Sequence, residues 1–130
     1  MTDTERRPKL GPNDRFIDEA FALAALTRRD FGAHKWGVGG LIIVAGAPGV
    51  AGAAVLSAMA AGRAGAGIMN VACPRSVAAL VAAAVPEAAT IALGDSEASV
   101  AGRQALQLLE AKLGKSAALL VGPGLGEDET

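Results

Sequence analysis

Two glycine-rich segments contain the residues best suited to hold a ligand: GAPGVAGAA at residues 46–54 and GPGLG at residues 122–126. Each follows an apolar run, and the first also opens a helical pattern. A loop with few side chains lets backbone N–H groups approach a phosphate or a ribose, and the amino terminus of a helix favours an anion. A tight turn without a ligand explains the first segment equally well, so the residues alone leave both interpretations open.

The first segment is not the fingerprint of classical dinucleotide-binding domains. Its glycines follow the spacing G-x-x-G-x-x-G, whereas the fingerprint is G-x-G-x-x-G. The fingerprint also needs an acidic residue about 20 positions further on, but the next apolar run ends at Cys73 and Pro74. The tripeptide GKS at residues 114–116 is not a Walker A loop either, because Leu109 stands where that motif has its first glycine and an apolar run follows it.

Few other side chains could do chemistry. His34 is the only histidine and has no neighbouring cluster of metal ligands, so a structural role is the expectation. Lys35 could contact an anion, although an exposed lysine in a loop is ordinary. Trp36 could stack on a ring, but we expect it to wedge the connector against the first helix. Asp128 and Glu129 could hold a metal, although acidic residues in a first helical turn are the commoner case.

Composition excludes several classes of function. The net charge is −1 without a run of Lys or Arg, which argues against a nucleic-acid partner. The single cysteine, Cys73, excludes an internal disulfide framework and a cysteine-built zinc site. The stretch from Leu41 to Gly62 is uncharged, but glycines and Pro48 interrupt it, so we expect no membrane span. No secretory signal is visible, and we expect a soluble, cytoplasmic protein.

Short apolar runs alternate with helical patterns along the chain. Short all-apolar strands between helices are typical of an α/β fold with a parallel sheet and right-handed crossovers. Ligands of such sheets bind beyond the carboxyl ends of the strands, where both glycine-rich segments fall. Gly65 or Gly67 is expected to end the second helix in a left-handed conformation. The expected strands are Leu41–Ala45, Ile68–Cys73, Ala89–Leu93 and Ala117–Val121, and the expected helices run from Asn13 or Asp14 to about Leu26, Ala53–Arg63, Ser76–Val85 and Ser96–Leu113.

Three segments resemble one family when taken together: HKWGVGGLIIVAGAPGVAGAAVLSAMAAGRAGAGIMNVACP, then PEAATIAL, then AALLVGPGLG. Their order and spacing, from about His34 to Gly126, are similar to those of the ADP- or ATP-dependent NAD(P)H-hydrate dehydratases. These are ribokinase-like proteins that also form the carboxy-terminal domain of bifunctional nicotinamide-nucleotide repair enzymes. This chain departs from the family pattern at Trp36, Ala45, Ala47 and Gly62, which bears on ligand affinity more than on membership.

The resemblance implies a partial ribokinase-like fold, with a mostly parallel sheet and helices on both faces. Members of the family are about twice as long as this chain. We therefore expect residues 1–12 to be a frayed amino terminus and residues 13–130 to be the amino-terminal portion of a dehydratase domain. The family's later segments, including the glycines and the catalytic aspartate of G-G-T-G-D, have no counterpart here. The truncated chain is therefore expected to be inactive.

The activity implied by the resemblance is the dehydration of hydrated NAD(P)H, written NAD(P)HX, with ADP or ATP as phosphoryl donor and Mg²⁺ as metal. By motif, Gly52, Ala53, Gly124 and Gly126 would face the substrate, and Lys35 is a further candidate. The full-length protein is expected to be a homo-oligomer. Two alternatives stay open: another ribokinase-like kinase acting on a vitamin-precursor alcohol, and a non-enzymatic half-domain that pairs with a separate chain.

Overall fold

The computed structural model describes residues 11–26, 31–32, 34, 37–94, 103–114, 116 and 118–126. Strands and helices alternate through most of this part of the chain, so the α/β class predicted from the sequence is confirmed. The elements are α1 (Glu19–Ala25), β1 (Gly40–Val44), α2 (Ala51–Arg63), β2 (Ile68–Cys73), α3 (Arg75–Ala84), β3 (Ala89–Ala92), α4 (Arg103–Leu113) and β4 (Ala118–Val121).

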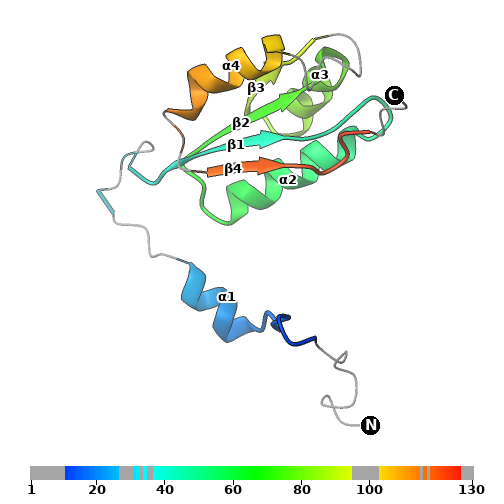
Figure 1. Cartoon of the computed structure of the whole chain (residues 1–130). Helices are drawn as coiled ribbons and strands as arrows, with labels where there is room; N and C mark the ends of the chain where they lie inside the picture. Colours follow the sequence, from blue (N-terminus) through cyan, green and yellow to red (C-terminus); the bar gives the residue numbers. More distant parts are fainter. Residues whose placement is uncertain are drawn as a thin grey trace.

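The four strands form one parallel sheet in the order β3-β2-β1-β4 (Figure 1). In the register of the sheet, Ile43 of β1 lies between Val71 of β2 and Leu120 of β4. Branched side chains such as Ile43 and Val71 suit extended backbone and pack well on a pleated surface. Because β1 is parallel to β2 and β4, the segments that follow these three strands leave the sheet at the same edge.

Helices cover both faces of the sheet, as predicted. On one face, the buried Ile43 and Val71 pack with Ala54 of α2 and Val77 of α3. On the other face, the core contains side chains from β1, β2 and α4, namely Ile42, Val44, Ala72, Ala105 and Leu109. Alternate residues of β1 therefore serve two cores, which explains its continuous apolar sequence.

The ends of several helices differ from the prediction. The first helix begins at Glu19, because the Oδ1 atom of Asp18 accepts a hydrogen bond from the Phe21 N–H at 2.8 Å. Asp14 instead closes a local turn, where its Oδ2 atom accepts from the Gly11 N–H at 2.9 Å. The prediction that Asn13 or Asp14 caps this helix is therefore wrong.

The start of α2 also differs from the prediction. Helix α2 begins at Ala51, two residues earlier than predicted, and Gly65 beyond its end has a φ of +97°. The left-handed position is therefore Gly65 and not Gly67. The predicted start of α4 at Ser96 lies outside the described residues.

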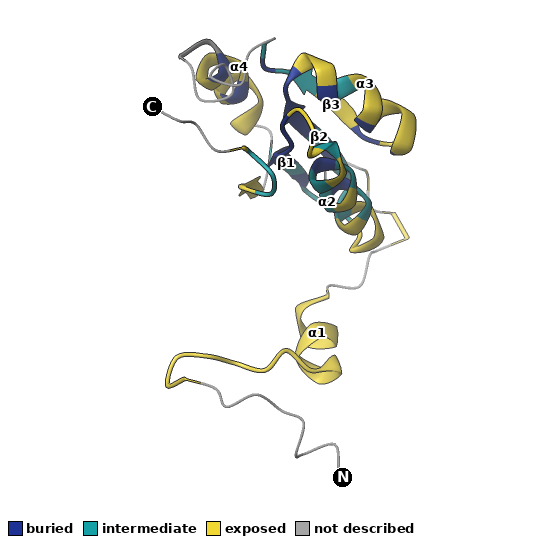
Figure 2. Cartoon of the chain, turned by 90° about the vertical axis from the view of Figure 1, so that its right-hand side faces the viewer, coloured by how far each residue is buried: buried dark blue, intermediate teal, exposed yellow. Residues whose placement is uncertain are grey.

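Helix α1 lies away from the sheet and contains no buried residue (Figures 1 and 2). Burial is concentrated in β1, β2 and the inner sides of α2, α3 and α4 (Figure 2). Within the described part of the chain, no helix is both long enough and apolar enough to cross a bilayer.

Candidate functional site

The two glycine-rich segments meet at the carboxyl edge of the sheet. The Gly46 N–H donates to the carbonyl oxygen of Pro123 at 2.9 Å, and the Gly122 N–H donates to the carbonyl oxygen of Val44 at 3.2 Å. Both loops arrive there because β1 and β4 are parallel neighbours, with Val44 opposite Val121. The predicted placement of the two loops beyond the strand ends is confirmed, and it is the position where sheets of this class bind ligands.

Gly124 lies close to the start of α2. A Cβ atom at this position would lie 2.7 Å from the Cβ of Ala53 and 3.4 Å from both the carbonyl oxygen and Cγ2 of Val50. Its φ of +64° also falls in the region that favours glycine. Two of the predicted site residues, Ala53 and Gly124, are thus brought together, and the contact explains why residue 124 has no side chain.

Gly52 and Gly126 differ in what surrounds them. A Cβ at Gly52 would meet no atom within 4 Å, so the first turn of α2 has open space beside it. A Cβ at Gly126 would lie 3.4 Å from the Cβ of Ala47, an ordinary contact, while its φ of +83° favours glycine. Gly52 and Gly126 are both exposed, and the space beside the Gly52 Cα is open. Lys35, the remaining one, lies outside the described residues.

Val50 is a residue that the sequence reasoning missed. It is the N-cap of α2, yet it makes no side-chain hydrogen bond to the helix. Ser, Thr, Asp or Asn usually fills that position and satisfies an amide of the first turn. An apolar residue there is the signal that could have identified it, because it leaves those amides without a side-chain acceptor. Val50 also touches the second loop beside Gly124.

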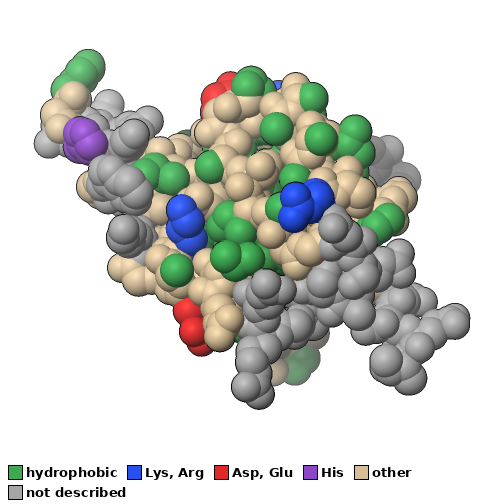
Figure 3. Space-filling model, turned by 90° about the horizontal axis from the view of Figure 1, so that it is seen from above, with side chains coloured by type: hydrophobic (Ala, Val, Ile, Leu, Met, Phe, Trp, Pro, Cys, Tyr) green, Lys and Arg blue, Asp and Glu red, His purple; other side chains and the backbone are tan. Residues whose placement is uncertain are grey.

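Few ionisable side chains that could act as a nucleophile, an acid, a base or a metal ligand lie at the carboxyl edge of the described part of the sheet. Cys73, at the carboxyl end of β2, is buried, and burial raises the pKa of its thiol, which favours the protonated form. No three His, Cys, Asp or Glu side chains among the described residues are grouped so that they could hold a metal ion. On a different face, seen from above the view of Figure 1, apolar side chains lie between isolated charged ones (Figure 3). The described part of the site can therefore offer backbone groups to a ligand, but it contains no acid–base pair.

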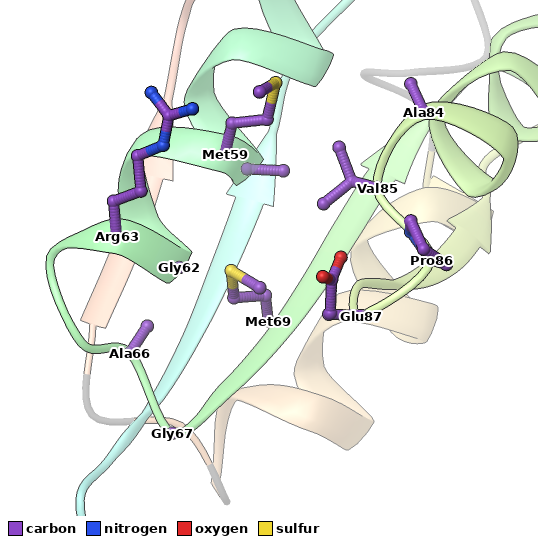
Figure 4. Close-up of a pocket in the computed structure, with 11 residues that line it drawn as sticks. Met59, Gly62, Arg63, Ala66, Gly67, Met69, Ala84, Val85, Pro86 and Glu87 are labelled. Atoms are coloured by element: carbon purple, nitrogen blue, oxygen red, sulfur yellow. The ribbon is translucent and has the colours of Figure 1, made fainter.

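A separate cavity of about 550 Å³ lies at the opposite end of the sheet, near the start of β2. The side chains of Met59, Met69 and Val85 line it, and Arg63 and Glu87 lie on different sides of it (Figure 4). It is distinct from the glycine-rich loops, which lie beyond the other ends of the strands. The cavity therefore takes no part in the site described above.

Comparison with known proteins identifies relatives of one kind. The sequence profile of the family described as NAD(P)H-hydrate dehydratase matches residues 41–130. The bifunctional NAD(P)H-hydrate repair enzyme Nnr of Moorella thermoacetica is 37% identical over 116 residues, which are 89% of this chain and 22% of that protein. The ADP-dependent (S)-NAD(P)H-hydrate dehydratase of Xanthomonas campestris is 37% identical over 122 residues, 92% of this chain and 41% of that protein.

Solved structures agree with the fold. A ribokinase-like superfamily protein from Enterococcus faecalis superposes with a TM-score of 0.70 at 23% identity, over 95% of this chain and 40% of its own. The ADP/ATP-dependent NAD(P)H-hydrate dehydratase from Bacillus subtilis, co-crystallised with ATP and Mg²⁺, gives a TM-score of 0.65 at 26% identity. That match covers 92% of this chain and 40% of the Bacillus protein. The chain thus spans less than half the length of the relatives it matches.

Proposed function

Because the chain belongs to the NAD(P)H-hydrate dehydratase family, we propose that it supplies a substrate-binding portion of an enzyme that converts NAD(P)HX to NAD(P)H. The relatives named above as dehydratases or repair enzymes support this assignment. The observation that carries it is the meeting of the two glycine-rich loops, with Gly124 packed on Ala53 and open space beside Gly52. This arrangement holds backbone groups at the edge of the sheet where ligands of parallel α/β sheets bind.

The residues of this chain bind and orient the substrate in this proposal. The loop after β1 and the first turn of α2 present N–H groups to a phosphate or ribose of NAD(P)HX, and the helix amino terminus favours the negative charge. The loop after β4 fixes the position of that turn through the contact between Gly124 and Ala53. Lys35 would add a positive charge from the connector. Holding the hydroxyl of the hydrated ring in one place is the contribution that such binding makes to catalysis.

The phosphoryl donor and its metal depend on groups outside this site. A nucleotide such as ADP or ATP supplies, when bound, a phosphoryl group that makes the substrate hydroxyl a better leaving group. The described residues provide no carboxylate cluster for Mg²⁺, so they do not fit that ion by themselves. We therefore assign binding of substrate, and not turnover, to the described part of this chain. A cytoplasmic location and a homo-oligomeric full-length protein complete the proposal.

Calorimetric titration of the 130-residue chain with NADHX tests the assignment. We expect measurable binding that Gly52→Val weakens by about tenfold, because a branched side chain would fill the open space beside the first turn of α2. Gly114→Val is the matched control, since a Cβ at Gly114 would also meet no atom within 4 Å, but Gly114 lies at the end of α4. Equal affinity of the wild-type chain and Gly52→Val for NADHX would contradict the assignment.

A further inference from the structure

The cavity near the start of β2 has the size of a site for a small molecule. It lies between the carboxyl end of α2, the start of β2 and the turn that joins α3 to β3, and its volume is about 550 Å³ (Figure 4). Small-molecule sites in proteins have volumes of roughly 300–1,000 Å³. None of the residues that line the cavity comes from β4 or from the two glycine-rich loops. Any ligand of this cavity would therefore bind apart from the candidate site.

Backbone hydrogen bonds fix the two turns that border the cavity. In the turn after α2, the Gly67 N–H donates to the carbonyl oxygen of Gly39 at 3.1 Å, which ties this turn to the residue before β1. In the turn before β3, the Ala88 N–H donates to the carbonyl oxygen of Val85 at 3.0 Å. The walls are thus held in place without a ligand, and a preformed site lowers the cost of ordering that binding must overcome.

Two methionines and Val85 form the apolar part of the lining. Met69 is 7% exposed and Val85 is 4% exposed, while Met59 is half-buried. The lack of a side chain at Gly62 leaves room for Met69, because a Cβ there would lie 3.3 Å from the Cε atom of Met69. Methionine side chains adapt to the shape of their neighbours and make favourable contacts with aromatic rings. This part of the lining therefore suits a flat, apolar body.

Arg63 and Glu87 bring opposite charges to different sides of the same cavity (Figure 4). Both side chains are exposed, and neither forms an ion pair or a hydrogen bond with another described residue. Glu87 would repel a purely anionic ligand, and Arg63 would repel a purely cationic one. A neutral apolar ligand would remove water from both charges without replacing it. Electrostatic complementarity therefore requires a ligand that carries both signs.

We propose that this cavity binds a small amphoteric molecule, whose apolar body lies on Met59 and Met69 between an amino group that faces Glu87 and a carboxylate that faces Arg63. A guanidinium group suits a carboxylate, because it donates two parallel hydrogen bonds to the two oxygens. An ammonium group donates charge-assisted hydrogen bonds to the carboxylate of Glu87. The inference does not depend on substrate binding at the glycine-rich loops, which lie beyond the other ends of the strands.

Nuclear magnetic resonance of the 130-residue chain with isotope-labelled methionine methyl groups tests the proposal. The probe is para-aminomethylbenzoate, which carries an ammonium group and a carboxylate at opposite ends of one ring at neutral pH. We expect saturable shifts of the Met59 and Met69 methyl signals, with a Kd in the millimolar range for a probe of this size. Para-methylbenzoate and para-methylbenzylamine, which each lack one charge, should bind about fivefold more weakly, because each loses one partly exposed charged contact.

Two substitutions assign each charge of the probe to its partner. With Glu87→Gln, the amphoteric probe should bind no more tightly than para-methylbenzoate, because the partner of its ammonium group is gone. With Arg63→Gln, it should bind no more tightly than para-methylbenzylamine. Glu110→Gln is the matched control, since Glu110 is an exposed glutamate of α4, outside the cavity, and the Kd should be unchanged. Circular dichroism confirms that each variant is folded.

Three results would overturn the proposal. The first is the absence of saturable shifts of the Met59 and Met69 signals up to about 10 mM probe. The second is equal affinity of the wild-type chain for the amphoteric probe and for the two singly charged compounds. The third is binding of the amphoteric probe that neither Glu87→Gln nor Arg63→Gln weakens. Because NAD(P)HX is absent throughout, failure of the proposed substrate binding would leave all of these measurements unaffected.

Discussion

The two outer strands of the sheet, β3 and β4, differ in composition. β3 has the small and polar residues of an edge strand, whereas β4 has the apolar residues of an interior strand. Both have four residues and both pair in parallel with one described neighbour. β3 reads Ala-Thr-Ile-Ala, with small or polar residues and one large apolar side chain, Ile91, which packs against the core shared with α4. β4 reads Ala-Leu-Leu-Val and exposes its three large side chains.

The difference shows that exposure alone does not mark an edge strand. β3 lies at one edge of the sheet, its exposed residues are small or polar, and α3 packs beside it. β4 ends the sheet in this chain with residues that normally belong in a core. Among the described residues, β4 therefore lies at an edge of the sheet but has the apolar composition of an interior strand.

The largest expected effect contrasts β1 with β4. Ile43→Ala should lower the free energy of unfolding by about 2–5 kcal/mol, because Ile43 is fully buried between the sheet and α2 and α3. Urea denaturation followed by circular dichroism measures the change. A loss below about 1 kcal/mol would mean that β1 is no better covered than β4.

The next effect tests how firmly β4 is attached at its carboxyl end. Gly124→Ala should cost about 1–3 kcal/mol, because the added Cβ would lie 2.7 Å from the Cβ of Ala53. Gly52→Ala is the control, since the space around Gly52 is open. The same denaturation experiment compares the two variants. Equal stability would show that the loop after β4 moves freely, and the exposure of β4 would then reflect loose attachment and not missing neighbours.

Much of the fold follows from the sequence, for reasons visible in particular residues. The run from Ile68 to Cys73 was predicted with its observed bounds, because a strand buried on both faces has a continuous apolar sequence and Pro74 ends it. The placement of both glycine-rich loops at one edge followed from the rule that parallel strands end at one edge of a sheet, whereas their meeting depends on β4 lying beside β1. Both inferences depend on local pattern and topology, which the sequence contains.

The remaining features depend on three-dimensional contacts. Asn13, Asp14 and Asp18 are all capable caps, and the turn between Gly11 and Asp14 decides that Asp18 begins α1. The role of Gly124 as a close-contact residue depends on where Ala53 lies, which no spacing reveals. Sequence pattern therefore predicted the edge of the sheet at which the two loops lie, but not which of their glycines pack and which stay open.

A smaller effect tests whether β3 keeps solvent away from the buried residues of β2. Cys73 lies opposite Ala92 of β3 and is fully buried, and burial raises the pKa of its thiol above the ordinary value of 9.0. The unfolded chain therefore loses this proton at a lower pH than the folded chain. Stability should be unaffected below about pH 8 and should fall by up to about 1.4 kcal/mol per pH unit above pH 9, until the folded-state pKa is reached.

The measurement is urea denaturation between pH 7 and about pH 10. Cys73→Ala is the control, because it removes the thiol and with it this contribution to the pH dependence. Identical pH profiles for the two proteins would show that solvent reaches Cys73 past β3. β3 would then be as open as β4, and the contrast between the two edges would fail.

The smallest effect concerns β4 itself. Leu120→Ala should cost less than about 1 kcal/mol in the 130-residue chain, because much of its side chain is already in water and its removal leaves no enclosed cavity. Its neighbour in the register is Ile43, so the two alanine variants probe the same face of adjacent strands. A cost as large as that of Ile43→Ala would show that Leu120 is as well enclosed as Ile43, and the contrast between β1 and β4 would then fail.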